Sequence, residues 1–150
     1  MVGPWLTLNG FGFMMEIKVE GSRRNKKFVQ AMLPSMLRQL NIENCSKALL
    51  IRIADECESN SNGLTLDLST YTGAYLIVIK PQRDLVQLGL TLAHEMVHVK
   101  QMAKGILRQT SGGNIWSGKR YSKKTPYLDM PWEIEAFSKQ ELILRRAFEE

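Results

Sequence analysis

Two histidines and a glutamate stand close together in the middle of the chain, in the order His-Glu-x-x-His at His94, Glu95 and His98. Residues 85–104 around them carry apolar side chains at spacings of three and four, which predicts one helix. Side chains four residues apart share a helix face, so both imidazoles can bind one metal ion while Glu95 lies beside it. Neutral imidazoles suit Zn²⁺, and an open coordination position would take a water whose pKa falls to about 7. Glu95 could then accept a proton from that water.

A less specific interpretation is a helix whose histidines make ordinary hydrogen bonds and whose glutamate is solvated. The chain contains 2 histidines, and both belong to this motif. Their joint placement on one helix face therefore favours the metal site.

A third ligand is missing from this helix, and the remaining candidates are carboxylates downstream. Residues 97–128 contain no Asp or Glu, and the next acids are Asp129, Glu133 and Glu135. Pro131 suits the first turn of a second helix, which would place Glu133 in that turn. Glu133 and Glu135 point about 200° apart on a helix, so only one of them can bind the same ion. We favour Glu133 and keep Glu135 as the alternative.

A His-Glu-x-x-His helix followed by a glutamate on a second helix resembles the gluzincin group of zincin metallopeptidases. The segment Pro-Trp-Glu-x-Glu-Ala after the motif is most similar to small SprT-like or phage-encoded metallopeptidases. The similar region covers roughly residues 75–140. The resemblance implies that His94, His98 and Glu133 hold Zn²⁺ and that Glu95 is the general base.

The chain departs from that group at Phe137, where many gluzincins have an aspartate that orients a histidine ligand. Either another group makes this contact, or Glu135 is the true ligand. Zincins often stabilise the oxyanion with a Tyr, His or Arg, and the resemblance makes Tyr121 and Tyr127 the catalytic candidates for that role.

The hydrophobic periodicity predicts an α+β fold with a twisted mixed β-sheet of about four strands, and the resemblance implies that this fold is zincin-like. One helix would back the sheet, and the His-Glu-x-x-His helix and a C-terminal helix would complete the fold. Pro34 would kink the first helix or divide it, and Asp84 could cap the second. The strands are expected at 13–20, 48–54, 64–69 and 75–80, and the helices at 23–40, 85–104 and 131–148. Residues 1–150 would form a single domain, with 1–13 as an arm or a tail.

In zincins the strand just before the active-site helix commonly forms the edge of the sheet and pairs with an extended substrate. By that resemblance Gly73, Ala74, Tyr75 and Leu76 would bind a peptide through their backbone. A plain core strand fits the same residues equally well.

Basic residues gather after the motif, although the whole chain carries a net charge of only +5. Residues 97–128 contain seven of them and no acid, so the rest of the chain has a net charge of −2. The seven are Lys100, Lys104, Arg108, Lys119, Arg120, Lys123 and Lys124. Residues 107–127 read as a solvated loop or a hairpin around Trp116-Ser117-Gly118. A solvated surface is the default interpretation of the seven charges, and the more specific one is an acidic or DNA-associated protein substrate or a nucleic acid.

These patterns predict a zinc-dependent endopeptidase that hydrolyses peptide bonds in a protein substrate. The alternative is a nucleic-acid-associated or regulatory binding protein with a structural or non-catalytic zinc site. No apolar run is long enough to span a membrane, and no secretory signal is recognisable. Cys45 and Cys57 lack close metal spacing and fit reduced thiols, so a cytoplasmic location and no membrane partner are expected.

Overall fold

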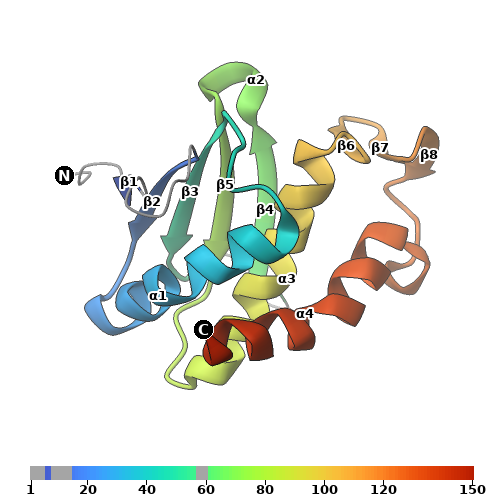
Figure 1. The fold of residues 1–150 in the computed structure, drawn as a ribbon. Helices are drawn as coiled ribbons and strands as arrows, with labels where there is room; N and C mark the ends of the chain where they lie inside the picture. Colours follow the sequence, from blue (N-terminus) through green and yellow to red (C-terminus); the bar gives the residue numbers. More distant parts are fainter. Residues whose placement is uncertain (1–5, 8–14, 57–60) are drawn as a thin grey trace.

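The computed structural model describes residues 6–7, 15–56 and 61–150. A mixed sheet packs against helices, a second small antiparallel sheet follows, and a helix ends the chain (Figure 1). The predicted α+β fold class is confirmed. Most of the expected arm at 1–13, together with Cys57, lies outside the described residues.

The strands of the main sheet and the helices that precede the small sheet occupy the first two thirds of the chain. In order, the elements are β1 (Leu6–Thr7), β2 (Glu16–Glu20), α1 (Arg23–Leu40), β3 (Ala48–Ile53), β4 (Gly63–Leu68), α2 (Ser69–Thr72), β5 (Ala74–Ile79), α3 (Leu85–Ala103), β6 (Leu107–Thr110), β7 (Gly113–Trp116), β8 (Lys119–Ser122), the 3₁₀ turn η2 (Tyr127–Asp129) and α4 (Pro131–Glu149). No helix among the described residues is long and apolar enough to cross a membrane.

The main sheet has the strand order β1-β2-β3-β5-β4. Strands β2, β3 and β5 run parallel, and β4 pairs antiparallel with β5. The prediction that the strand before the His-Glu-x-x-His helix forms the sheet edge is wrong. Ala74, Tyr75 and Leu76 belong to β5, which is hydrogen-bonded on both sides, and Gly73 is the turn residue before it. After β4 the chain turns through α2 and returns inside the sheet, so β4 becomes the edge.

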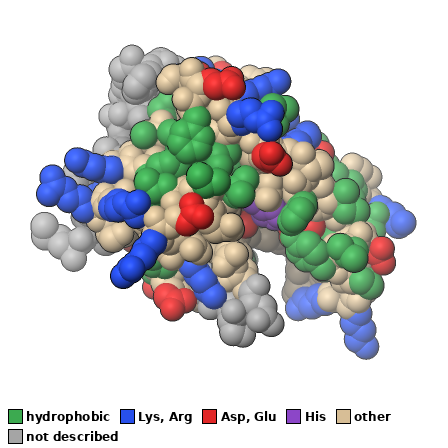
Figure 2. All heavy atoms as spheres, turned by 90° about the horizontal axis from the view of Figure 1, so that it is seen from below, with side chains coloured by type: hydrophobic (Ala, Val, Ile, Leu, Met, Phe, Trp, Pro, Cys, Tyr) green, Lys and Arg blue, Asp and Glu red, His purple; other side chains and the backbone are tan. Residues whose placement is uncertain are grey.

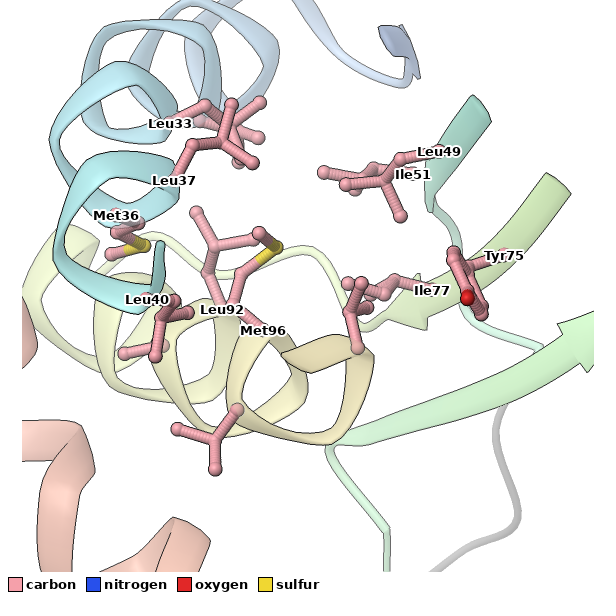
Figure 3. Packing of buried hydrophobic residues seen from close by; sticks show 14 of the residues in the cluster. Leu33, Met36, Leu37, Leu40, Leu49, Ile51, Tyr75, Ile77, Leu92 and Met96 are labelled. Carbon is pink, nitrogen blue, oxygen red and sulfur yellow. The ribbon is translucent and has the colours of Figure 1, made fainter. Parts of the chain in front are cut away.

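One face of the sheet forms the core against α1 and α3 (Figure 3). Alternate residues of β3, among them Leu49 and Ile51, are buried against this layer. Leu37 of α1, and Leu92 and Met96 of α3, fill the space between the helices and the strands. The sheet and α1 thereby fix the position of α3, the helix that carries the motif.

The helix boundaries follow from local sequence. Asp84 caps α3, because its Oδ1 accepts hydrogen bonds from the backbone N–H groups of Val86 at 2.9 Å and Gln87 at 3.4 Å. Helix α1 is a single helix with Pro34 inside it. A Cβ on Gly89 of α3 would lie 2.4 Å from Leu144 Cδ1, so α3 and α4 approach closely there.

The basic stretch forms the small sheet β6-β7-β8. Trp116 pairs with Lys119 across a turn whose Ser117 and Gly118 have φ values of 48° and 83°. The predicted hairpin at this turn is confirmed, and β6 adds a third strand.

Candidate metal centre

His94, Glu95 and His98 form a group on α3 that could hold a metal ion. Their ligand atoms all lie within 4.8 Å of one another, and the centroids of the two imidazole rings are 5.0 Å apart. This is the cluster that the His-Glu-x-x-His spacing predicts.

Glu133, in the first turn of α4, faces both imidazoles. Its Oε1 lies 2.9 Å from His94 Nε2 and 2.7 Å from His98 Nε2. Neighbouring ligands of a tetrahedral ion with bonds of about 2.0–2.1 Å are separated by about 3.3 Å. Nitrogen and oxygen atoms of the kind zinc prefers are therefore already gathered around one point, slightly closer than coordination requires.

Two carboxylates, Glu95 and Glu133, are close enough to compete for the third ligand position. Thr65 of β4 donates a hydrogen bond from Oγ1 to Glu95 Oε1 at 2.7 Å, which holds the Glu95 carboxylate toward the sheet edge. Glu133 instead contacts the two imidazole nitrogens directly. Glu133 therefore suits the ligand position, and the Glu95 carboxylate lies beside it.

The protonation of His98 follows from its neighbour Gln101. The Gln101 Nε2 donates to the Trp132 backbone oxygen and to Glu135 Oε1, both at 3.1 Å, so its own Oε1 faces His98 Nδ1 at 2.8 Å. His98 Nδ1 must then carry a hydrogen, and in the neutral ring Nε2 offers a lone pair. A lone pair 2.7 Å from a carboxylate oxygen of Glu133 requires a cation, either a proton or a metal ion. The donor set thus fits a metal.

The contact expected at position 137 comes from other side chains. His94 Nδ1 lies 2.8 Å from Gln140 Oε1, and the exposed Phe137 ring stands edge-on to His94 at 6.4 Å between centroids. Glu135 contacts Gln101 at 3.1 Å and Lys139 at 3.7 Å. The amides of Gln140 and Gln101 therefore orient His94 and His98, respectively, and Glu135 accepts a hydrogen bond from Gln101.

The charges of this cluster stabilise one another. Burial disfavours the charged imidazoles, but the hydrogen bonds to Glu133 and the negative charge of Glu95 outweigh it and raise the pKa of both His94 and His98. Burial alone would raise the pKa of Glu133, yet the hydrogen bonds from the two imidazoles lower it to about 2. Without a metal, Glu133 is a carboxylate shared by two imidazoles whose pKa is raised above the ordinary value of 6.5.

The Glu95 side chain is more deeply buried than the Glu133 side chain. Burial raises the pKa of Glu95, while the positive charge of His98 and the Thr65 hydrogen bond partly oppose the shift. Strand β4 approaches so closely that a Cβ on Gly63 would lie 2.9 Å from Glu95 Oε2. The sheet edge and the candidate base therefore touch.

A cleft of about 720 Å³ opens over these residues, between β4, α3, the small sheet and the start of α4. In the space-filling view the histidine surface lies in a hollow between apolar side chains (Figure 2). Tyr127 lines the cleft; burial, the charges of Glu133 and Glu95, and a hydrogen bond with Glu133 raise its pKa to about 12. Tyr121 packs edge-on against Trp132, with 5.5 Å between ring centroids, and is not among the residues that line the cleft.

Five of the seven basic side chains in residues 97–128 lie on or next to the small sheet. The exposed ones here are Arg108, Lys119, Arg120, Lys123 and Lys124. Lys104, at the end of α3, donates to the backbone oxygen of Asn41 at 3.1 Å. The small sheet that carries these charges borders the cleft through Leu107, Gln109 and Asn114, and the described residues that line the cleft include no Lys or Arg.

Sequence reasoning missed Thr65, Gln101 and Gln140. Gln101 stands three residues after His98 on the same helix, so spacing alone could have suggested it. Thr65 and Gln140 come from other elements and carry no local signal. Comparison with known proteins gave no match, since no family model, curated protein or solved structure is significantly similar to this chain.

Proposed function

We propose that the protein is a zinc-dependent endopeptidase that resembles the gluzincins, with His94, His98 and Glu133 as its metal ligands. One observation carries the proposal: a single carboxylate oxygen of Glu133 meets the Nε2 atoms of both histidines at 2.7–2.9 Å, beside the buried Glu95. A bound zinc ion would supply Lewis-acid chemistry, polarising a peptide carbonyl and acidifying water.

Glu95 acts as the general base and then as the general acid. Its carboxylate accepts a proton from the attacking water and returns that proton to the leaving amine. Thr65 keeps one oxygen of Glu95 in place through the 2.7 Å hydrogen bond, and the raised pKa suits a group that must take up and release a proton.

Tyr127 is the donor for the developing oxyanion. A pKa of about 12 keeps its hydroxyl protonated at neutral pH, so that it can donate a hydrogen bond to the substrate oxygen. The position of Tyr127 in the cleft favours it over Tyr121, which packs on Trp132 instead.

The substrate would bind as an added strand along β4. This strand is the sheet edge, it lines the cleft, and its Thr65 contacts Glu95. Backbone hydrogen bonds to an edge strand bind extended peptides with little dependence on side chains. We therefore propose β4, in place of Gly73 to Leu76, as the strand that binds the peptide backbone.

A nucleic-acid-associated or regulatory binding protein with a non-catalytic zinc site is the competing proposal. The exposed basic residues of the small sheet favour it. A binding protein has no need of a buried carboxylate beside the metal, so Glu95 favours the peptidase. Salt-dependent binding to DNA by a zinc-loaded protein that cleaves no peptide would support the alternative.

The test uses the zinc-loaded parent and Glu95→Gln, with unfolded casein and a quenched-fluorescence peptide library as substrates. We expect the parent to cleave both and Glu95→Gln to keep its zinc while losing about a thousandfold in rate. Equal cleavage by the two proteins would contradict the role of Glu95. A zinc-loaded parent that cleaves neither substrate would contradict the peptidase proposal.

A further inference from the structure

The exposed side chain of Gln109, on β6, is hydrogen-bonded to the backbone of the edge strand β4. Its Nε2 donates to the Thr65 backbone oxygen at 3.0 Å, and its Oε1 accepts from the Asp67 backbone N–H at 3.0 Å. Gln109 also lines the cleft over the candidate metal centre. A polar side chain from the small sheet therefore occupies the edge to which a substrate would add.

The two bonds fall on the outward side of β4. The backbone N–H and C=O groups of the even-numbered residues of β4 face β5. The bond from the Lys80 N–H to the Asn62 oxygen, at 2.9 Å, sets this alternation. The backbone groups of Gly63, Thr65 and Asp67 consequently point away from β5. An added strand would have to use these groups.

Gln109 takes the place of one residue of such a strand. In a parallel ladder, one residue donates its N–H to a carbonyl and accepts at its C=O from the N–H two positions further along. The Gln109 amide does the same toward Thr65 and Asp67. A peptide added in the antiparallel sense also needs the Thr65 carbonyl, so it meets the same obstruction.

The obstruction lies next to the chemistry. The hydroxyl of Thr65, whose carbonyl Gln109 occupies, holds Glu95 at 2.7 Å. On the other side of Thr65, Gly63 lies against Glu95, and its carbonyl accepts a hydrogen bond from the nearby Ser61 hydroxyl at 2.6 Å, which leaves a second lone pair. Among the residues that the structure describes, the β4 edge is thus open toward Gly63 and closed toward Asp67.

We infer that Gln109 is a specificity-determining residue, whose amide closes the β4 groove at Thr65 and Asp67, so that a bound peptide must end or turn away from β4 on that side. The inference rests on the proposed function. It narrows the substrates of the endopeptidase to peptide segments that pair with β4 only along the Gly63 side. Removal of the amide would lengthen the usable groove.

The experiment measures peptide binding in zinc-loaded Glu95→Gln protein, which does not consume the probe. The probes are fluorescein-labelled peptides of alternating Thr and Val, three to nine residues long. Each is titrated against this background alone and against the background with Gln109→Ala, Gln109→Glu or Arg108→Ala. The Glu variant cannot donate to the Thr65 carbonyl, and Arg108→Ala is the matched control on the same strand.

With Gln109 present, the affinity for peptides should rise with peptide length only until the peptide fills the Gly63 side of the β4 edge, and then stay constant. In Gln109→Ala and Gln109→Glu it should continue to rise for longer peptides, by about tenfold, as two backbone hydrogen bonds would provide. Hydrogen exchange of the Asp67 amide should accelerate in Gln109→Ala, which removes its acceptor, and stay unchanged in Arg108→Ala.

An identical dependence on length in all four proteins would overturn the inference, and so would binding of no peptide by any of them. If Gln109→Ala lowers the melting temperature but peptide affinity still levels off at the same peptide length, Gln109 only holds the small sheet against β4, and the inference is wrong. Failure of the proposed function appears separately, as a zinc-loaded parent without hydrolysis or a parent without zinc.

Discussion

His94 and His98 meet the same oxygen of Glu133 from the same helix, but the protein holds them differently. His98 is 6% exposed, and its partner Gln101, 1% exposed, is anchored to α4 by the Trp132 backbone oxygen and Glu135. His94 lies nearer the cleft, with Gln140 as the partner of its Nδ1 and the exposed Phe137 at its side. The fold fixes the metal-facing nitrogen of His98 through a buried, anchored amide, whereas the partner of His94 is a half-buried side chain.

The largest expected effect is on the pH dependence of zinc binding. Both imidazoles have a raised pKa, so below those values zinc must displace two protons. Zinc affinity should fall by about a hundredfold per pH unit there, because each proton contributes a factor of ten. Isothermal titration across pH checks this. A tenfold change in zinc affinity per pH unit would mean that zinc displaces only one proton, so that only one of the two imidazoles is protonated beside Glu133.

The folding stability of the zinc-free protein should depend on pH in the opposite sense to zinc affinity, and should fall as the pH rises above the ordinary pKa of the histidines. A raised imidazole pKa stabilises the folded state below the ordinary value of 6.5, and this stability is lost as the pH rises through the raised value. The lowered pKa of Glu133 stabilises the fold above its ordinary value of 4.5, and this is lost as the pH falls toward about 2. Melting temperatures in chelator should therefore peak between those two ordinary values, and Glu133→Gln should flatten the profile.

A matched pair of substitutions tests the difference between the two halves of the site. Gln101→Ala removes the buried amide that fixes His98, so zinc affinity should fall by about 10–100-fold. It also leaves the buried Nδ1–H of His98 without the Gln101 oxygen that accepts from it, at a cost of about 1–3 kcal/mol in the free energy of unfolding. Gln140→Ala should cost less than about tenfold in affinity and little stability. Equal losses in the two variants would mean that both imidazoles are held alike.

The smallest expected effect comes from strengthening the weaker half. Gln140→Glu replaces the amide oxygen facing His94 Nδ1 with a carboxylate, which accepts a stronger, charge-assisted hydrogen bond. Zinc affinity should rise by a few-fold, about 0.5–1 kcal/mol, as measured by competition with a chromogenic chelator. A decrease would show that the Gln140 side chain does not orient His94 in solution.

The predictable parts of this site were those encoded locally. The α3 helix and the common face of His94 and His98 follow from spacings of three and four, and the Asp84 cap from its position before an apolar run. Glu133 could be named in advance because acids are scarce after the motif and Pro131 sets the start of α4.

The strand order could not be derived in the same way. Strands β4 and β5 are neighbours in sequence and in space, and nothing in their residues says which of them pairs with β3. That choice decides which strand becomes the edge, and it depends on packing across the whole sheet. Thr65 and Gln109 owe their positions to the same long-range packing, so their contacts emerged only from the structure.

Zinc content after purification without a chelator tests the central claim most directly, in the parent, Glu133→Gln and Glu135→Gln. The two glutamates stand two residues apart on α4, but Glu133 faces the imidazoles and Glu135 faces Gln101. We predict about one zinc per chain in the parent and in Glu135→Gln, and none in Glu133→Gln. Zinc retained by Glu133→Gln, or absent from the parent even after reloading, would contradict the proposed metal centre.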